Sequence, residues 1–487
     1  MLFLGLDNYI FDPLDEVTEK ADDKTINLLK VRGMLKKAIK DDISPMRHYV
    51  DGGPCIVEKD FKIFLDKKLA KALLLKSGFG TSSYDIDVEK SREGNFLNVE
   101  SIQLRCSEGD NVVIDIPSYL NSSYFKLTGS VWVIMFDSLK IIRKRFLADE
   151  LEFSHEILCL ESLQGGNLDL TECEYRRFNI YDCYLTNIKL GSSVRSFMQL
   201  FSNSTVDYAD FSLVDFKKIR NIDEMFTYTY YRGSIDLSKL NPIETIRTFF
   251  YGHIDGDIKL GKLSSYKKMF ASCTVLGTVY LKDLDLSDLH VSSFDDMFLY
   301  AHIKALDLRG TSIDYVAFSG AEISTLYLSQ ETLFIIDKEG VTFNSVIENL
   351  VFTNVEKPSD CSKYRRSGFL SISQLENITF EDCSEEFILD TVGYITCASF
   401  NKLLVDKITI KGNNSESDKK KIVKVIKDFL TKENEEYRGK IISKYARDTK
   451  TSVAEVERLY SSSKNNNVKD AINEMLSKEA DSLVTYE

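Results

Sequence analysis

The chain has 487 residues, a formal net charge of −13, only 6 prolines and 1 tryptophan. With 43% apolar residues it is not a globally disordered chain, and the scarcity of proline excludes proline-rich linkers. The acidic balance disfavours nucleic-acid binding, because that affinity rests on Lys and Arg that neutralise phosphates. Residues 415–487 carry 15 Lys and Arg against 14 Asp and Glu, so the acidity lies in the residues before them.

The N-terminal residues are expected to form helices and then a strand-rich cap. Apolar residues recur at three- and four-residue steps from Asp23 to Lys40 and from Lys59 to Lys76, which predicts two amphipathic helices within a helical region 1–80. Short strand-like runs follow over 81–150. We expect this range to cap the next domain, because an exposed terminal repeat would leave a strand edge open.

A repeat dominates residues 151–412. Short triplets, each with two apolar residues around a variable one, follow a buried-type aromatic by seven to nine residues. In such a strand the outer two residues point into the core and the middle one points out. The pattern predicts a solenoid with one parallel sheet. The pairs are Phe226 with Ile235–Leu237, Phe250 with Ile258–Leu260, Phe270 with Val279–Leu281, Phe298 with Leu306–Leu308, Phe318 with Leu326–Leu328, and Phe343 with Leu350–Phe352.

Weaker triplets extend the array in both directions. They are Leu168–Leu170, Phe178–Ile180 and Ile188–Leu190 upstream, and Ile378–Phe380 and Ile408–Ile410 downstream. Met269, Phe270, Cys273, Leu276 and Leu281, followed by an Asp-Leu-Ser turn and a second Met-Phe pair, resemble the bacterial surface-protein (BspA-like) type of leucine-rich repeat. The resemblance implies an α/β repeat fold, an irregular leucine-rich-repeat solenoid that binds other molecules through its sheet.

Four amphipathic stripes predict a C-terminal helical module over 415–487. Ser452 and Glu455 form a capping box at the start of one helix. Asn467 is predicted to cap the last helix, which carries Ala471, Ile472 and Leu476. The last three helices, over about 440–477, resemble a UBA-type bundle. That family often binds ubiquitin-like proteins through a hydrophobic loop, whereas the corresponding loop here, Arg447 to Lys450, is polar.

The candidate site is the line of middle residues on the sheet, which we call the outward row. Neighbouring strands lie about 5 Å apart, so these side chains would project from one surface. Opposite charges and tyrosines favour protein recognition, because Tyr supplies rigid amphipathic contact area. The alternative is a solvated sheet without a partner. The partner-binding candidates are Asp236, Lys259, Tyr280, Asp307 and Tyr327.

The sequence gives few signals for redox, metal or membrane chemistry. Nine single cysteines without a C-x-x-C motif predict buried thiols in a reducing compartment, and no metal site or cofactor is expected. The carboxylates of Asp283, Asp285 and Asp288 near His290 are interpreted as solvated loop groups. The N-terminus lacks a basic segment and the longest purely apolar run has six residues, so we expect a cytoplasmic protein without a membrane span.

The leading hypothesis is therefore a non-enzymatic scaffold that binds a partner protein with a neutral or basic surface through the solenoid sheet, with no nucleic-acid partner and no small-molecule ligand. An inhibitor of a host factor, of viral or bacterial origin, fits this description, as does an adaptor. A second hypothesis is an adaptor in a ubiquitin-like pathway. A third is an enzyme whose site lies between the N-terminal region and the solenoid; the absence of P-loop, G-x-S-x-G and G-x-G-x-x-G motifs disfavours it.

Overall fold

The chain divides into two compact units, Met1–Ser234 with Lys239–Asp255, and Ile235–Ser238 with Gly256–Glu487. Each contains a stack of parallel β-strands, so the predicted solenoid architecture is confirmed. The computed structural model describes residues 56–58, 62–64, 86–93, 96–104, 110–116, 124–129, 136–143, 157–312, 318–332, 344–356, 372–397, 405–412, 416–432, 435–462 and 466–487.

Strands of the first unit form two sheets. From β4 (Phe96–Leu104) to β11 (Tyr184–Leu190) they alternate between the sheets along the chain, so each turn of the coil there adds one strand to each sheet. The larger sheet of this unit contains, in parallel, β5 (Asp110–Ile116), β7 (Phe136–Arg143), β9 (Gln164–Leu170), β11 (Tyr184–Leu190), β12 (Thr205–Asp210), β13 (Tyr230–Tyr231) and β15 (His253–Ile254). The other contains β4 (Phe96–Leu104), β6 (Tyr124–Gly129), β8 (Ile157–Glu161) and β10 (Arg177–Tyr181). The triplet Phe178–Ile180 thus belongs to the second sheet and not to the predicted single one.

Antiparallel strands complete the N-terminal part of this unit. Strand β3 (Ile86–Glu93) pairs with β4, and β1 (Ile56–Glu58) pairs with both β2 (Lys62–Phe64) and β5. The prediction of a helix from Lys59 to Lys76 is therefore wrong at its start. Lys62–Phe64 is a strand, and its backbone forms hydrogen bonds with β1. The helix predicted from Asp23 to Lys40 lies outside the described residues.

After β11, the side of the coil opposite the larger sheet consists of tight turns instead of strands. Backbone hydrogen bonds join these turns from one coil to the next: the amides of Phe201 and Phe226 donate to the carbonyl oxygens of Met225 and Thr248, at 2.9 and 2.7 Å. The turns repeat the same left-handed backbone conformation, which reverses the chain within a few residues. The left-handed residues of the first unit here are Gln199, Asn203, Glu224, Tyr228, Arg247 and Tyr251, with φ between +51° and +59°.

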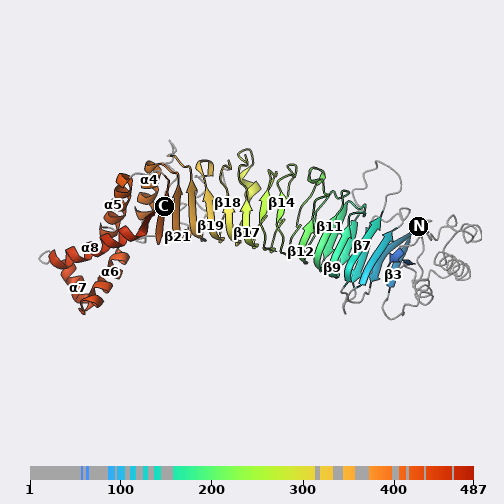
Figure 1. The fold of residues 1–487 in the computed structure, drawn as a ribbon, viewed down its shortest axis with the longest axis horizontal. Coiled ribbons are helices and arrows are strands. Elements are labelled where there is room, and N and C mark those ends of the chain that lie inside the picture. Colours follow the sequence, from blue (N-terminus) through green and yellow to red (C-terminus); the bar gives the residue numbers. More distant parts are fainter. Residues whose placement is uncertain are drawn as a thin grey trace, which may run out of the picture. The chain divides into compact units, whose positions relative to one another are not determined.

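Strands of the second unit form one parallel ladder, in which β17 (Thr274–Tyr280), β18 (His302–Asp307) and β19 (Glu322–Leu328) are seen side by side in Figure 1. The outer residues of the predicted triplets are buried here; Ile235 is 3% and Leu237 0% exposed. This confirms the predicted alternation. In order, the strands are β14 (Ile235–Leu237), β16 (Ile258–Leu260), β17 (Thr274–Tyr280), β18 (His302–Asp307), β19 (Glu322–Leu328), β20 (Ser345–Thr353), β21 (Ile372–Glu381), β22 (Lys407–Lys411) and β23 (Val484–Tyr486).

Buried aromatic rings stack along the core of each unit. In the second unit, Phe270 and Phe298 have ring centroids 5.3 Å apart and nearly parallel planes. In the first unit, Phe226 stacks in the same way on Phe249 at 5.2 Å. Phe249 is the fully buried member of its pair, so the choice of Phe250 as the core aromatic was wrong. Phe343 lies outside the described residues.

Helices follow the ladder of the second unit, beside β21 in Figure 1. The four predicted C-terminal helices are confirmed as α5 (Glu416–Lys432), α6 (Glu435–Asp448), α7 (Val453–Ser461) and α8 (Asn466–Leu483). The Ser452 hydroxyl accepts the Glu455 amide at 3.3 Å, as the capping box predicts. Asn467 lies inside the first turn of α8 and not at its cap.

Two elements at this end were not predicted. Helix α4 (Glu385–Cys397) follows β21, and its Phe387 packs edge-on against Phe352 and Phe380. After α8 the chain returns to the sheet, where β23 pairs with β22. The helical module is thus inserted between two neighbouring strands. None of the helices that the structure describes is long and apolar enough to cross a membrane.

Candidate functional site

The outward row predicted from the sequence is continuous on the sheet of the second unit. Backbone register pairs its members one strand after another, so they lie about 4.8 Å apart along the ladder. The sequence reasoning therefore identified residues that the fold does bring together. The pairs are Asp236 with Lys259, Lys259 with Tyr280, Tyr280 with Asp307, and Asp307 with Tyr327.

The members of the row differ in exposure. Asp236 and Lys259 are exposed, and the Asp236 carboxylate accepts the Ser238 amide at 2.9 Å. Tyr280 and Tyr327 are half-buried. Asp307, in contrast, is only 2% exposed. The expectation that every middle residue projects into solvent is therefore wrong for Asp307.

Arg309 is the hydrogen-bond partner of the buried Asp307. It lies two residues later on the same side of the sheet, and its Nε and Nη2 donate to the two carboxylate oxygens at 2.9 and 2.8 Å. This hydrogen bonding to Asp307 raises the pKa of Arg309 above its ordinary value. The guanidinium carbon lies 4.8 Å from the centroid of the Tyr327 ring. Arg309 therefore lies over Tyr327 at this point of the surface. The sequence analysis did not identify Arg309, although its position two residues after Asp307 was the available signal.

Beyond Tyr327 the same line of residues changes character. Val351, Thr379, Thr409 and Thr485 continue it in register. Val351 and Thr409 are each 7% exposed. Small β-branched side chains of this kind are common on strands and offer few anchors for a partner. The polar and aromatic part of the line therefore ends at Tyr327.

The first unit carries an aromatic row that sequence reasoning did not single out. Tyr184, Thr205, Tyr230 and His253 begin four neighbouring strands and are paired in register. Tyr184 is 51% exposed. The rings of Tyr230 and His253 stack with centroids 4.6 Å apart, and both side chains bind the Asp255 carboxylate at 3.0 Å. The run from Thr227 to Arg232, rich in tyrosine, was the available signal.

Charged groups flank this aromatic row. Arg232 forms an ion pair with Asp207 at 3.1 Å, and its guanidinium carbon lies 5.6 Å from the Tyr230 ring centroid. A hydrogen bond with Tyr230, then the charge of Asp207, raises the pKa of Arg232. Tyr208, on the same sheet, is 52% exposed.

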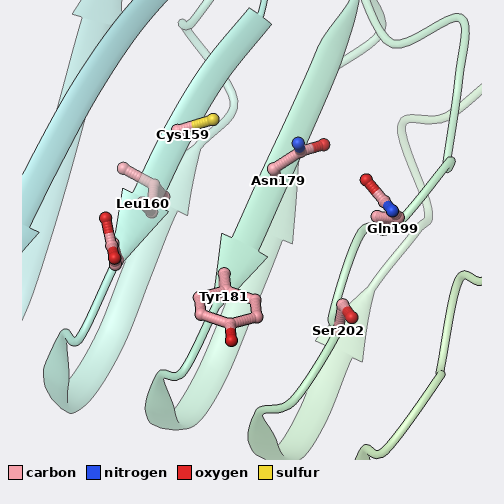
Figure 2. A pocket seen from close by; sticks show the side chains of 7 residues that line it. Cys159, Leu160, Asn179, Tyr181, Gln199 and Ser202 are labelled. Carbon is pink, nitrogen blue, oxygen red and sulfur yellow. The ribbon is translucent and has the colours of Figure 1, made fainter.

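A shallow pocket of about 270 Å³ lies on the other sheet of the first unit. Figure 2 shows Cys159, Asn179 and Gln199 on successive turns of the coil, with Tyr181 and Ser202 at the neighbouring edge. The guanidinium of Arg177 donates to Asn179 at 2.9 Å and to Gln199 at 3.1 Å, which fixes both amides. Burial lowers the pKa of Arg177. Amides, hydroxyls, a thiol and the Glu161 carboxylate line the pocket, a set that suits hydrogen bonding.

Of the five cysteines whose side chains the structure describes, four are buried, as predicted, and Cys159 is half-buried. Burial raises the pKa of Cys173 and Cys183 to about 12 and that of Cys383 to about 11. Thiols held in this protonated form are poor nucleophiles. Cys397 is the last residue of α4, and Cys55, Cys106 and Cys361 lie outside the described residues.

The aspartates near His290 have local partners. Asp285 accepts the amide and hydroxyl of Ser287, and its pKa is lowered by these bonds. Asp288 pairs with Lys262 at 2.9 Å, and His290 accepts the Ser292 amide at the start of a short 3₁₀ helix. Within the part of the chain that the structure describes, no group of three His, Cys, Asp or Glu residues could hold a metal ion.

Comparison of the chain with protein families, with curated proteins and with solved structures finds no match.

Proposed function

We propose that the protein is a non-enzymatic scaffold that binds a partner protein through the outward row of its second unit. The observation that carries the proposal is the unbroken register of charged and aromatic side chains from Asp236 to Tyr327. A line of this kind presents its side chains at a fixed spacing on a rigid sheet, so binding costs little ordering entropy.

Arg309 and the tyrosines are the expected anchors. Arginine and tyrosine are enriched among the residues that carry most of the binding energy of protein interfaces. Two charge-assisted hydrogen bonds to Asp307 fix the guanidinium over Tyr327, so its orientation is set before a partner arrives. Tyr280 lies on the neighbouring strand. The acidity of the chain before residue 415 favours a partner with a neutral or basic surface.

Affinity capture of the full-length tagged chain from its native cell tests the proposal. A variant with Lys259→Glu and Tyr280→Ala changes one exposed charge and one anchor and keeps the buried Asp307. We expect this variant to lose the captured partner and to bind the purified partner at least about tenfold more weakly.

The matched control is Tyr300→Asn. Tyr300 belongs to the same unit, is 62% exposed and lies off the row, and its φ of +53° suits asparagine. It should bind the partner as the unchanged chain does. Equal partner recovery by the row variant and the control would overturn the proposal, as would equal loss.

The finer fold assignment is also a proposal. We infer that the second unit is a leucine-rich repeat of the BspA-like type, because Met269, Phe270, Cys273 and Leu281 are fully buried, as that repeat requires. Leu276 departs from the pattern, since it is 47% exposed while Val275 lies in the core.

A second candidate function is binding of a ubiquitin-like protein through helices α6 to α8. The packing of these three helices around Ala446, Val456 and Ile472 supports a UBA-like bundle. Titration of ubiquitin into the full chain, followed by calorimetry, tests it. Heat that disappears in an Ile472→Asp variant supports the candidate, and no heat at millimolar ubiquitin rejects it.

A further inference from the structure

One turn of the first unit carries small polar side chains, whereas the turns on either side of it carry exposed tyrosines. Residues Ser202–Thr205, which we call the low turn, have the sequence Ser-Asn-Ser-Thr. The preceding equivalent turn carries Tyr181 and Tyr184, which are 48% and 51% exposed. The following one carries Tyr228, which is 58% exposed, and Tyr230. Small polar side chains therefore lie between two pairs of tyrosines.

Register fixes the spacing of these tyrosines. Thr205 pairs with Tyr184 on one side and with Tyr230 on the other, so the two tyrosines begin strands that are two positions apart. At about 4.8 Å per strand, their backbones are separated by about 9.6 Å along the sheet. Beyond Tyr230 the next position is filled by His253, which stacks on it. The low position thus occurs once within this row of four residues.

The neighbourhood of the low turn is acidic. Asp182 is exposed, and its side-chain partners among the described residues are neutral, Ser162 at 3.3 Å and Asn203 at 3.4 Å. Asp207 pairs with Arg232, and Asp255 accepts bonds from Tyr230 and His253. Glu161 lines the pocket that Ser202 and Tyr181 also line. These four carboxylates outnumber the two arginines described beside them, Arg232 and Arg177.

We propose that the low turn and its flanking tyrosines bind a polyproline II segment that carries a basic residue. A polyproline II helix repeats every three residues, or about 9.3 Å, which matches the tyrosine spacing. Proline rings pack between aromatic side chains in grooves that recognise such segments. The basic residue would pair with the carboxylates around Asp182. This site is separate from the outward row, so either proposal can fail alone.

Other extended partners fit the spacing less well. An α-helix advances about 5.4 Å per turn, close to one strand spacing, and would meet Thr205 and the tyrosines alike. A β-strand repeats a given side every 6.6–6.8 Å or so, between one and two strand spacings. Nucleic acid is disfavoured because its phosphates would meet the carboxylates. The single small residue, Thr205, between Tyr184 and Tyr230 therefore favours the longer repeat.

Fluorescence anisotropy of a labelled ten-residue proline-rich peptide ending in two arginines, mixed with the full-length protein, tests the proposal. Thr205→Tyr fills the low position and leaves both flanking tyrosines in place; we expect it to weaken binding at least about tenfold. Tyr184→Ala should weaken binding to a similar extent, because it removes one of the two flanking tyrosine rings. Tyr208→Ala is the control, because Tyr208 is equally exposed on the same strand as Thr205 but lies outside the row.

Selective loss in the two row variants, with unchanged binding by Tyr208→Ala, supports the site. Absence of binding to the unchanged protein at millimolar concentration overturns it. Equal binding of a peptide whose prolines are replaced by glycine, or whose arginines are replaced by glutamate, also overturns it. A neutral oligosaccharide that binds with the same variant pattern, while the peptide does not, would assign the low turn to carbohydrate and refute the proposal.

Discussion

Removal of Arg309 is predicted to destabilise the second unit more than removal of its partner Asp307. Asp307 is 2% exposed and accepts three hydrogen bonds, from Nε and Nη2 of Arg309 at 2.9 and 2.8 Å and from the Arg309 amide at 3.1 Å. Arg309→Ala leaves a buried carboxylate with the backbone bond alone. Each lost charge-assisted bond is worth about 1.5 kcal/mol or more, so the expected loss is about 3 kcal/mol.

Asp307→Ala is expected to cost less. The Arg309 side chain is 31% exposed, so its guanidinium can turn to water when the carboxylate is absent. Solvent screening reduces the penalty, and we expect about 1–2 kcal/mol. The double variant should lose less than the sum of the two single variants, because the main penalty of each is an unpaired partner.

Urea unfolding followed by circular dichroism measures these differences in the full chain. The prediction is a clear order, with Arg309→Ala the least stable, and a coupling free energy of about 2 kcal/mol between the two positions. A loss below about 0.5 kcal/mol for both single variants would be the behaviour of a surface ion pair. That result would refute the reasoning that Asp307 is a buried structural group.

Four further predictions concern the core, the turns and the thiols. Phe226→Ala, which removes a fully buried ring from the aromatic stack, should cost about 3–5 kcal/mol in urea unfolding. Tyr300→Asn should leave stability within about 1 kcal/mol of the unchanged chain or raise it, because asparagine tolerates positive φ better than tyrosine; a larger loss would contradict the exposed placement of Tyr300. Mass spectrometry after iodoacetamide treatment at pH 8 should find Cys159 alkylated well before the buried Cys173 and Cys183. Because burial raises the pKa of these two thiols from 9.0 to about 12, the unfolded chain releases their protons first; stability should hold below pH 9 and fall as pH rises toward 12. Stability that is flat over this range would contradict their burial.

The triplets were predictable because alternation with a period of two residues records burial directly. Ile258 and Leu260 are buried and Lys259 between them is exposed, as the pattern indicates. Adjacent aromatics were not separable in this way. Phe249 and Phe250 differ by one position, and only the turn geometry decides which enters the core.

Exposure within the outward row could not be read from the sequence alone. Burial of Asp307 and its pairing with Arg309 are properties of the assembled sheet. The aromatic row of the first unit was not predicted from the sequence for a related reason. Its members Tyr184, Thr205 and Tyr230 precede buried strand residues at unequal chain intervals, and only backbone register aligns them.

Site-specific photo-crosslinking in the native cell tests the proposed protein binding most directly. A photoreactive phenylalanine analogue would replace Tyr280 or Tyr327 in the outward row, and Tyr300 as the exposed control in the same unit. The proposal predicts the same protein adduct from both row positions and none from position 300. Adducts from position 300 alone, or none from either row position, would contradict it.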